Sequence, residues 1–310
     1  MLQTFRTCGT FSARNPMKIF YYGFILPLSR LPFFVLYGIS NVFYFIFYYL
    51  SGYRKKVVMQ NIRNSFPEKT HKEHVLICKQ FYRHLCDITL ESLKIFSIRE
   101  HEVYERMICK NPEVVNRYFD QGRSIILAGG HFNNWELFAV AIDHAVKHQT
   151  IAIYKPMTNL FFDQKMRETR SKYGLRMIST KIVRQVMEQE RGSMTMTIFG
   201  IDQSPPLTSN SYWMRFLNQD TGVLFGAERY AKEFNYPVVF CRINKESRGH
   251  YSFEFVDVVE FPLESAFGEI TEKVTHLIEQ DIIKNPQYWL WSHKRWKHKR
   301  PQGHVNSPSN

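Results

Sequence analysis

Apolar and polar positions alternate along most of the chain in a way that predicts short strands followed by amphipathic helices. Residues 70–96 repeat apolar side chains at helical spacing, and residues 100–118 form a second, more polar helical stretch. Short apolar runs then alternate with amphipathic stretches, which is typical of an α/β sheet with parallel pairs. The expected strands cover residues 124–128, 150–154, 194–199, 238–243 and 251–258, and the expected helices cover residues 134–146, 159–173, 181–189, 222–234 and 265–283.

The N-terminal region departs from this pattern because it is almost entirely apolar. Residues 31–50 hold no charged side chain over twenty positions, which is about the length that crosses a bilayer. A membrane helix is therefore expected. Pro27, Arg30 and Pro32 interrupt the longer apolar run, so a helix lying in the membrane interface and a buried hairpin both stay open. Cations at residues 54–56 favour a cytoplasmic position for the rest of the chain.

These patterns divide the chain into three parts. We expect an N-terminal segment with a hydrophobic membrane anchor over residues 1–51 and an α/β domain over residues 52–300. The polar tail, residues 301–310, is expected to be disordered.

Charge and cysteine content narrow the partners and the cellular setting. The 310 residues carry a formal net charge of +13, and 15% of them are aromatic. Excess positive charge favours an anionic partner, and acidic proteins, anionic membrane surfaces and nucleic acids all fit that sign. The five cysteines are scattered and form no C-x-x-C pair, so neither a disulfide framework nor a zinc site is expected.

A possible catalytic group follows the first central strand. The apolar run at residues 124–128 leads into two glycines and His131, and Glu136 follows five positions later. Functional groups of α/β sheets collect at the carboxyl ends of strands, so His131 is expected there. If its ring folds back toward Glu136, the carboxylate fixes the tautomer and makes the histidine a better base. A histidine that only caps the following helix is the alternative.

Other mechanisms fit the sequence less well. It contains no G-x-S-x-G nucleophile elbow, no phosphate-binding loop, no G-x-G-x-x-G and no H-E-x-x-H motif. No cysteine lies near His131 in the sequence. A base without an obvious protein nucleophile indicates direct transfer, in which the base activates a hydroxyl of the substrate.

Five blocks, in the expected order, resemble the lipid A biosynthesis (lauroyl/myristoyl) acyltransferase family. This family is a branch of the glycerolipid acyltransferase superfamily, whose first block is H-x-x-x-x-D/E. The resemblance implies a mixed sheet flanked by helices, similar to glycerol-3-phosphate acyltransferase, with an N-terminal membrane-anchor helix. The blocks are GYRKKVVMQNIRNSFPEK at Gly52–Lys69, HFNNWE at His131–Glu136, IYKPMTNLFFDQKMRETRSKYG at Ile153–Gly174, IDQSP at Ile201–Pro205 and NPQYWLWSHKRWK at Asn285–Lys297.

The resemblance also implies an activity and roles for the matching residues. The family transfers a fatty acyl chain from acyl-carrier protein, or acyl-coenzyme A, to a hydroxyl of a lipid A precursor, with no acyl-enzyme, cofactor or metal. His131 would be the general base and Glu136 would orient it. Arg170 matches the family's arginine, which binds an acidic group or steadies the oxyanion, and Arg167 is its alternative.

Three further positions complete the site that the resemblance implies. Lys155 stands where many relatives have arginine, and it keeps the charge but loses the bidentate fork that would hold an acceptor phosphate. Asp202 and Gln203 would shape the site at another strand end, although Asp202 is equally compatible with a turn cap.

The resemblance implies acyl-carrier protein and anionic membrane lipids as partners, with the enzyme on the cytoplasmic side of the inner membrane and no role for nucleic acid. A lysophospholipid or aminolipid acceptor stays open. So do a lipid hydrolase or thioesterase and a membrane-attached nucleic-acid-binding protein, because the basic run 292–300 contains an aromatic residue. Its Trp296, like Trp289 and Trp291, is expected to be a packing residue.

Overall fold

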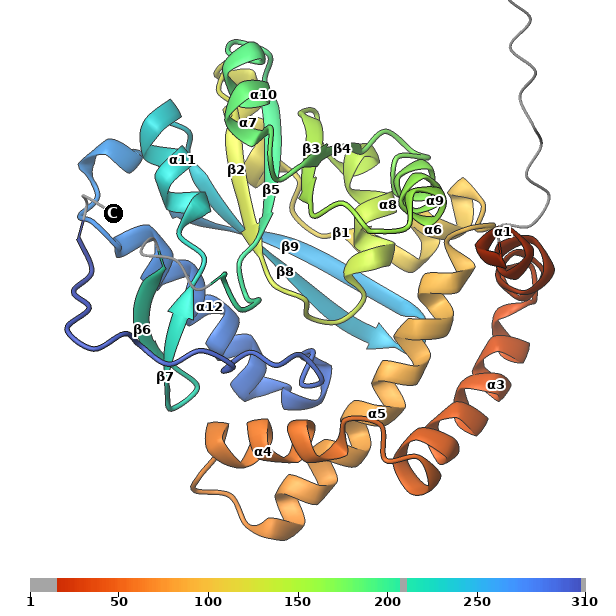
Figure 1. The fold of residues 1–310 in the computed structure, drawn as a ribbon. Helices are drawn as coiled ribbons and strands as arrows, with labels where there is room; N and C mark the ends of the chain where they lie inside the picture. The colour runs from red at the N-terminus through yellow and green to blue at the C-terminus, as the bar shows by residue number, and fades with distance from the viewer. Residues whose placement is uncertain (1–15, 207–210, 308–310) are drawn as a thin grey trace, which may run out of the picture.

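A mixed sheet of seven strands forms the centre of the computed structural model, which describes residues 16–206 and 211–307 (Figure 1). The strand order is β1-β9-β8-β2-β5-β3-β4, and every neighbouring pair is parallel except β8 with β9. The predicted α/β class is confirmed. The strands are β1 (Met107–Cys109), β2 (Ile125–Gly129), β3 (Gln149–Tyr154), β4 (Arg176–Ser179), β5 (Thr195–Gly200), β8 (Val238–Ser247) and β9 (His250–Val259), and a separate hairpin pairs β6 (Tyr212–Phe216) with β7 (Gln219–Val223).

Helices cover both faces of the sheet, because each central strand is apolar on both sides. One core places α6, α7 and α8 against β2, β8 and β9. The other places α5, α10, α11 and α12 on the opposite face, together with buried tryptophans from the C-terminal segment. The helices are α5 (His71–Lys94), α6 (Glu100–Arg106), α7 (Glu113–Asp120), α8 (Trp135–Ala145), α9 (Leu160–Arg170), α10 (Val183–Gln189), α11 (Gly226–Phe234) and α12 (Glu269–Lys284), with single turns η3 (Pro262–Glu264) and η4 (Pro286–Tyr288).

Local sequence explains where some of these elements begin. The long helix α5 is capped by Thr70, whose side chain accepts from the backbone of Glu73 while the Glu73 carboxylate accepts from the backbone of Thr70. The single helix predicted over residues 100–118 is wrong. Its middle forms β1, because Met107 to Cys109 pair with β9, and two helices flank that strand.

The N-terminal helices lie along α5 at the edge of the domain (Figure 1). The 18 residues Phe33–Leu50 form the one helix among the described residues that is long and apolar enough to cross a membrane. The elements are α1 (Pro16–Phe20), η1 (Tyr21–Ile25), α2 (Leu26–Ser29), α3 (Phe33–Phe45), η2 (Ile46–Leu50) and α4 (Lys55–Ser65).

Part of the C-terminal tail is bonded to the β6–β7 hairpin. The Asn306 side chain exchanges two hydrogen bonds with the backbone of Trp213 on β6, at 2.9 and 2.8 Å. Residues 308–310 lie outside the described residues. Four cysteines are free thiols, three of them buried, and Cys8 lies outside the described residues.

Candidate active site

The carboxyl ends of three adjacent parallel strands bring the predicted site residues together. β2 lies beside β5, with Gly129 opposite Gly200, and β5 lies beside β3. His131 follows β2, and Asp202 and Gln203 follow β5. Lys155 follows β3. All three strands therefore deliver polar side chains to one edge of the sheet, where α/β proteins usually bind ligands.

Asp202 holds His131 by two hydrogen bonds. The Nδ1 atom of the ring lies 2.7 Å from Asp202 Oδ1, and the His131 backbone N–H donates to Oδ2 at 2.8 Å. The Asp202 side chain is only 3% exposed, whereas that of His131 is 26% exposed. A carboxylate on Nδ1 leaves Nε2 as the basic nitrogen.

Burial and charge act in opposite directions on this pair. Burial lowers the pKa of His131, but the Asp202 charge and hydrogen bond outweigh burial, and the pKa lies above its ordinary value of 6.5. Burial raises the pKa of Asp202, yet the charge of His131 and hydrogen bonds from His131 and Trp289 lower it to about 2. Asp202 is therefore ionised at neutral pH and raises the basicity of His131.

The C-terminal segment also holds the Asp202 carboxylate in place. The Trp289 indole Nε1–H donates to Asp202 Oδ2 at 2.9 Å, and the backbones of Phe132 and Trp289 form an isolated antiparallel bridge. Gly130 lies against Asp202, since a Cβ at this position would come within 3.2 Å of the carboxylate. The close approach of His131 to Asp202 thus depends on the glycine that precedes the histidine.

Glu136 has a different partner from the one that the spacing predicts. It lies in the first turn of α8, and its carboxylate forms a bidentate pair with Arg170, at 2.9 Å from Nε and 2.5 Å from Nη2. Its hydrogen-bond donors are Arg170 and the Trp135 indole, not His131. Glu136 still acts on His131 through space, because its charge raises the histidine pKa as a lesser contribution after Asp202.

Gln203 occupies the open side of the histidine. Its Nε2 lies 3.1 Å from Nε2 of His131, so the amide N–H donates to the neutral ring. This hydrogen bond occupies the one lone pair of Nε2. The edge of the Trp135 indole lies beside the ring, with the two centroids 5.2 Å apart.

A cleft of about 580 Å³ opens at His131. It is lined by three cations that sequence reasoning named, Lys155, Arg167 and Arg170, and by Arg229 of α11. Arg170 is committed to Glu136, and Arg167 pairs with Asp163 at 3.2 Å. Lys155 and Arg229 are exposed at the cleft, where positive charge favours an anionic ligand.

An apolar cavity of about 130 Å³ is also lined by His131. Phe138, Ala139 and Leu175 contribute to its wall. Cys241 also lines it, but burial raises the pKa of this thiol well above its ordinary value, so it is not a thiolate nucleophile at neutral pH. The cavity and the cleft share the lining residues His131, Ala152, Ile198, Phe199 and Gly200.

A buried carboxylate–histidine pair between a cationic cleft and an apolar cavity suits a reaction on a lipid. A sequence profile described as bacterial lipid A biosynthesis acyltransferase matches residues 11–298. The chain belongs to this family. It is an acyltransferase. No curated protein sequence matches the chain.

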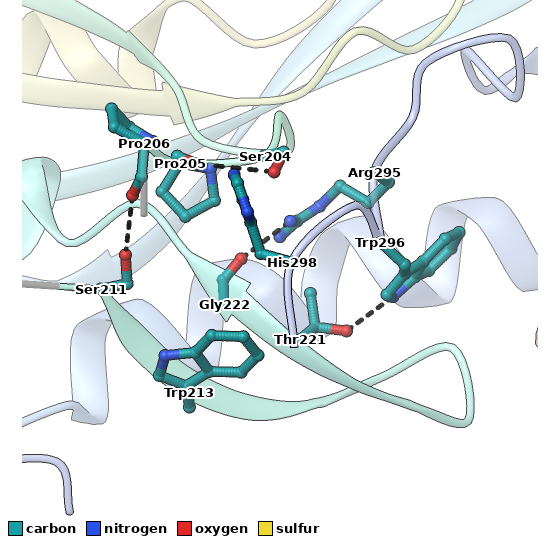
Figure 2. A pocket seen from close by; sticks show the side chains of 10 residues that line it. All are labelled: Ser204, Pro205, Pro206, Ser211, Trp213, Thr221, Gly222, Arg295, Trp296 and His298. Atoms are coloured by element: carbon teal, nitrogen blue, oxygen red, sulfur yellow. Dashed lines mark hydrogen bonds between the residues drawn. The ribbon is translucent and has the colours of Figure 1, made fainter. Parts of the chain in front are cut away.

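The family's C-terminal block is bonded to β7 and to the loop after Asp202, and Figure 2 shows its bonds to β7. Arg295 is 3% exposed and donates to the Gly222 carbonyl at 2.7 Å, while the Trp296 indole donates to Thr221 at 2.8 Å. The backbone N–H of Ser204 donates to the His293 ring at 3.1 Å. Arg295 and Trp296 line a space of only about 10 Å³, so these two residues of the basic run are packed inside this acyltransferase, whereas Lys294, Lys297, Lys299 and Arg300 are exposed.

Sequence reasoning missed two contributions to the acyltransferase site. Trp289 and Trp291 are fully buried, as packing residues are expected to be, but Trp289 also holds Asp202. Arg229 lies in a predicted helix without any motif, so its place at the cleft follows only from the packing of α11. Within the described residues, no group of three or more histidine, cysteine or acidic side chains is placed to hold a metal ion.

Proposed function

We propose that the protein is a membrane-bound acyltransferase that moves a fatty acyl chain from an acyl thioester to a hydroxyl of a lipid A precursor. The thioester is carried by acyl-carrier protein or coenzyme A. The observation that supports this most strongly is the His131 ring itself. Its Nδ1 is fixed by the buried carboxylate of Asp202, and His131 lines both the cationic cleft and the apolar cavity.

In the proposed mechanism the acceptor hydroxyl displaces Gln203 and donates to Nε2 of His131. The ring takes the hydroxyl proton as the oxygen attacks the thioester carbonyl carbon, and Asp202 stabilises the imidazolium that forms. The tetrahedral intermediate collapses, the carbon–sulfur bond breaks, and the proton on Nε2 passes to the departing thiolate. One ester and one free thiol result, and the enzyme returns to its starting state.

Substrate placement follows from the character of the two spaces. The apolar cavity receives part of the acyl chain, because Phe138, Leu175 and Cys241 offer no polar group to it. Lys155 and Arg229 bind acidic groups of the acceptor in the cleft. Arg170, which lines the same cleft, places positive charge near the developing oxyanion, and its bidentate pair with Glu136 fixes its position.

The setting proposed for this reaction is the cytoplasmic face of the inner membrane. The apolar helix Phe33–Leu50 and the net charge of +13 support attachment to an anionic lipid surface. Acyl-carrier protein, which is acidic, would approach the same basic surface.

An acyl-transfer assay with purified enzyme tests the proposal. Labelled acyl-acyl-carrier protein is supplied with a lipid A precursor, a lysophospholipid or an aminolipid, and mass spectrometry identifies the product. One acyl chain gained by the lipid A precursor with the wild type, but not with His131→Ala, is the expected result. Transfer only to the lysophospholipid or the aminolipid would show that the proposed acceptor is wrong. Release of free fatty acid without transfer would show that the protein is a hydrolase.

A further inference from the structure

The helix Phe33–Leu50 has two faces of opposite character. Its outward face exposes Phe34, Val42, Phe45 and Tyr49, which follow one another at helical spacing and are 53–76% exposed. The preceding helices add Phe20 and Phe24, which are also about half exposed. We call these six residues the outer face. Large apolar side chains gathered in this way indicate a membrane or protein contact.

The inward face is polar at its middle and bonded to the catalytic domain. The Ser40 hydroxyl donates to the buried carboxylate of Asp87 on α5 at 2.6 Å. Arg248, in the turn between β8 and β9, binds the same carboxylate at 3.0 and 2.5 Å and donates to Asn41 at 3.0 Å. The centre of the apolar helix is therefore held by an ion pair that belongs to the domain.

The segment just before the helix is bonded to the same domain. Lys94, at the end of α5, donates to the Leu31 carbonyl at 3.1 Å, and the Ser97 hydroxyl donates to the Ser29 carbonyl at 2.6 Å. Near the end of the helix, the Tyr48 ring packs against Tyr82 of α5 with the centroids 5.6 Å apart. The domain thus contacts the segment before the helix, the middle of the helix and its last turns.

This packing is incompatible with a helix that crosses the bilayer. At 1.5 Å per residue the helix is about 27 Å long, and its middle would lie at the bilayer centre. Asp87 and Arg248 would then lie there too, with the exposed side of α5 in hydrocarbon. Charged groups at that depth are strongly unfavourable.

We propose that the N-terminal helices instead lie in the plane of one anionic leaflet, with the outer face about 5–10 Å below the headgroups. The charge of the N-terminal region supports an anionic leaflet as the partner, because residues 1–67 contain no aspartate or glutamate. Lys18, Arg30 and Lys56 are exposed among the apolar side chains, where they meet lipid phosphates. The proposal concerns how the enzyme sits on lipid, and it holds or fails independently of the acyl-transfer reaction.

The helix α9 connects the N-terminal helices to the cleft. Phe161 of α9 packs against Tyr21 and Tyr22, with ring centroids 5.7 and 6.2 Å apart. Arg167 and Arg170 of the same helix line the cleft. A lipid acceptor would therefore pass from the leaflet to His131 along the length of α9.

A depth profile of single spin labels tests the orientation. The full chain, with Cys8 and Cys109 replaced by serine, carries one new cysteine at Phe34, Val42 or Tyr49 and is bound to vesicles of equal parts phosphatidylcholine and phosphatidylglycerol. An in-plane helix gives three equal, shallow depths. A crossing helix would place position 42 about 10 Å deeper than the other two, and that result would overturn the proposal.

A matched pair of variants tests the surface. Phe45→Glu changes a residue of the outer face that is 54% exposed, and Leu263→Glu changes one in η3 that is 64% exposed. Partition onto the same vesicles should fall roughly tenfold for Phe45→Glu and stay unchanged for Leu263→Glu, with circular dichroism showing that both fold. Unchanged partition of Phe45→Glu, or an equal loss in both variants, would refute the proposed surface.

Discussion

Replacing Asp202 with asparagine tests which carboxylate raises the basicity of His131. Asp202 is hydrogen-bonded to the ring, whereas Glu136 is the partner that the sequence spacing suggests. Asp202→Asn keeps the size of the side chain and removes its charge. The amide cannot satisfy all three donors that meet the carboxylate, namely the His131 ring, the His131 backbone N–H and the Trp289 indole. Glu136→Gln is the matched control, because it removes the other nearby carboxylate and leaves these three bonds in place.

The expected magnitude follows from the charge that is removed. An opposite charge in hydrogen-bond contact favours the charged form of a histidine, and Asp202, being 3% exposed, is poorly screened by water. Asp202→Asn should therefore lower the pKa of His131. The plateau rate should fall by about 10²–10⁴, because the imidazolium formed during transfer loses its counter-charge.

The assay is the pH profile of kcat/KM for acyl transfer. His131 acts as a base only when neutral, so activity rises with pH through its pKa, which lies above 6.5 in the wild type. Asp202→Asn should move this acid limb to lower pH, and Glu136→Gln should move it in the same direction by much less. A larger shift with Glu136→Gln than with Asp202→Asn would refute the reasoning and restore the His131–Glu136 dyad.

Three other changes have definite expected outcomes. Arg170→Lys keeps the charge but loses the bidentate pair with Glu136, so initial rates should fall about tenfold to a hundredfold, while Arg167→Lys, on an exposed side chain, stays near wild type. Ala139→Phe fills the apolar cavity and should shift donor preference to shorter acyl chains in a competition assay; Ala139→Ser should leave the preference unchanged. Burial raises the pKa of Glu91, so the contribution of Glu91 to stability should be fully present below its unfolded pKa of 4.5 and should be lost as the pH rises through the higher folded pKa. Glu91→Gln should abolish that dependence in thermal melts, and Glu91→Ala should lower the melting temperature further by leaving buried donors unpaired.

The sequence predicts the central strands well because they are buried on both sides. Continuous apolar runs such as Ile125 to Ala128 are typical of strands covered by helices on both faces, and the glycines and histidine after this run indicate the strand end. Short edge strands carry no such signal. The sequence pattern of the three residues of β1 predicts part of a helix, because only their pairing with β9 makes them a strand.

The partner of His131 could not be found from spacing. Glu136 is five residues away and Asp202 is 71 residues away, so only the order of strands in the sheet decides which carboxylate reaches the ring. Sequence periodicity shows that β2 and β5 are strands but not that they are neighbours. Arg170 was found through the family motif, but its pairing with Glu136 depends on how α9 packs against α8.

The bond from Trp289 to Asp202 has a consequence for the order in which a new chain matures. A ribosome makes the apolar helices near the N-terminus first, and they are available to lipid while most of the domain is still unmade. The histidine and its carboxylate are synthesised next, but the indole that supports that carboxylate comes 87 positions after it. A nascent chain is therefore expected to settle on the membrane before it is able to react, and a chain cut short just before Trp289 should bind vesicles yet transfer no acyl group.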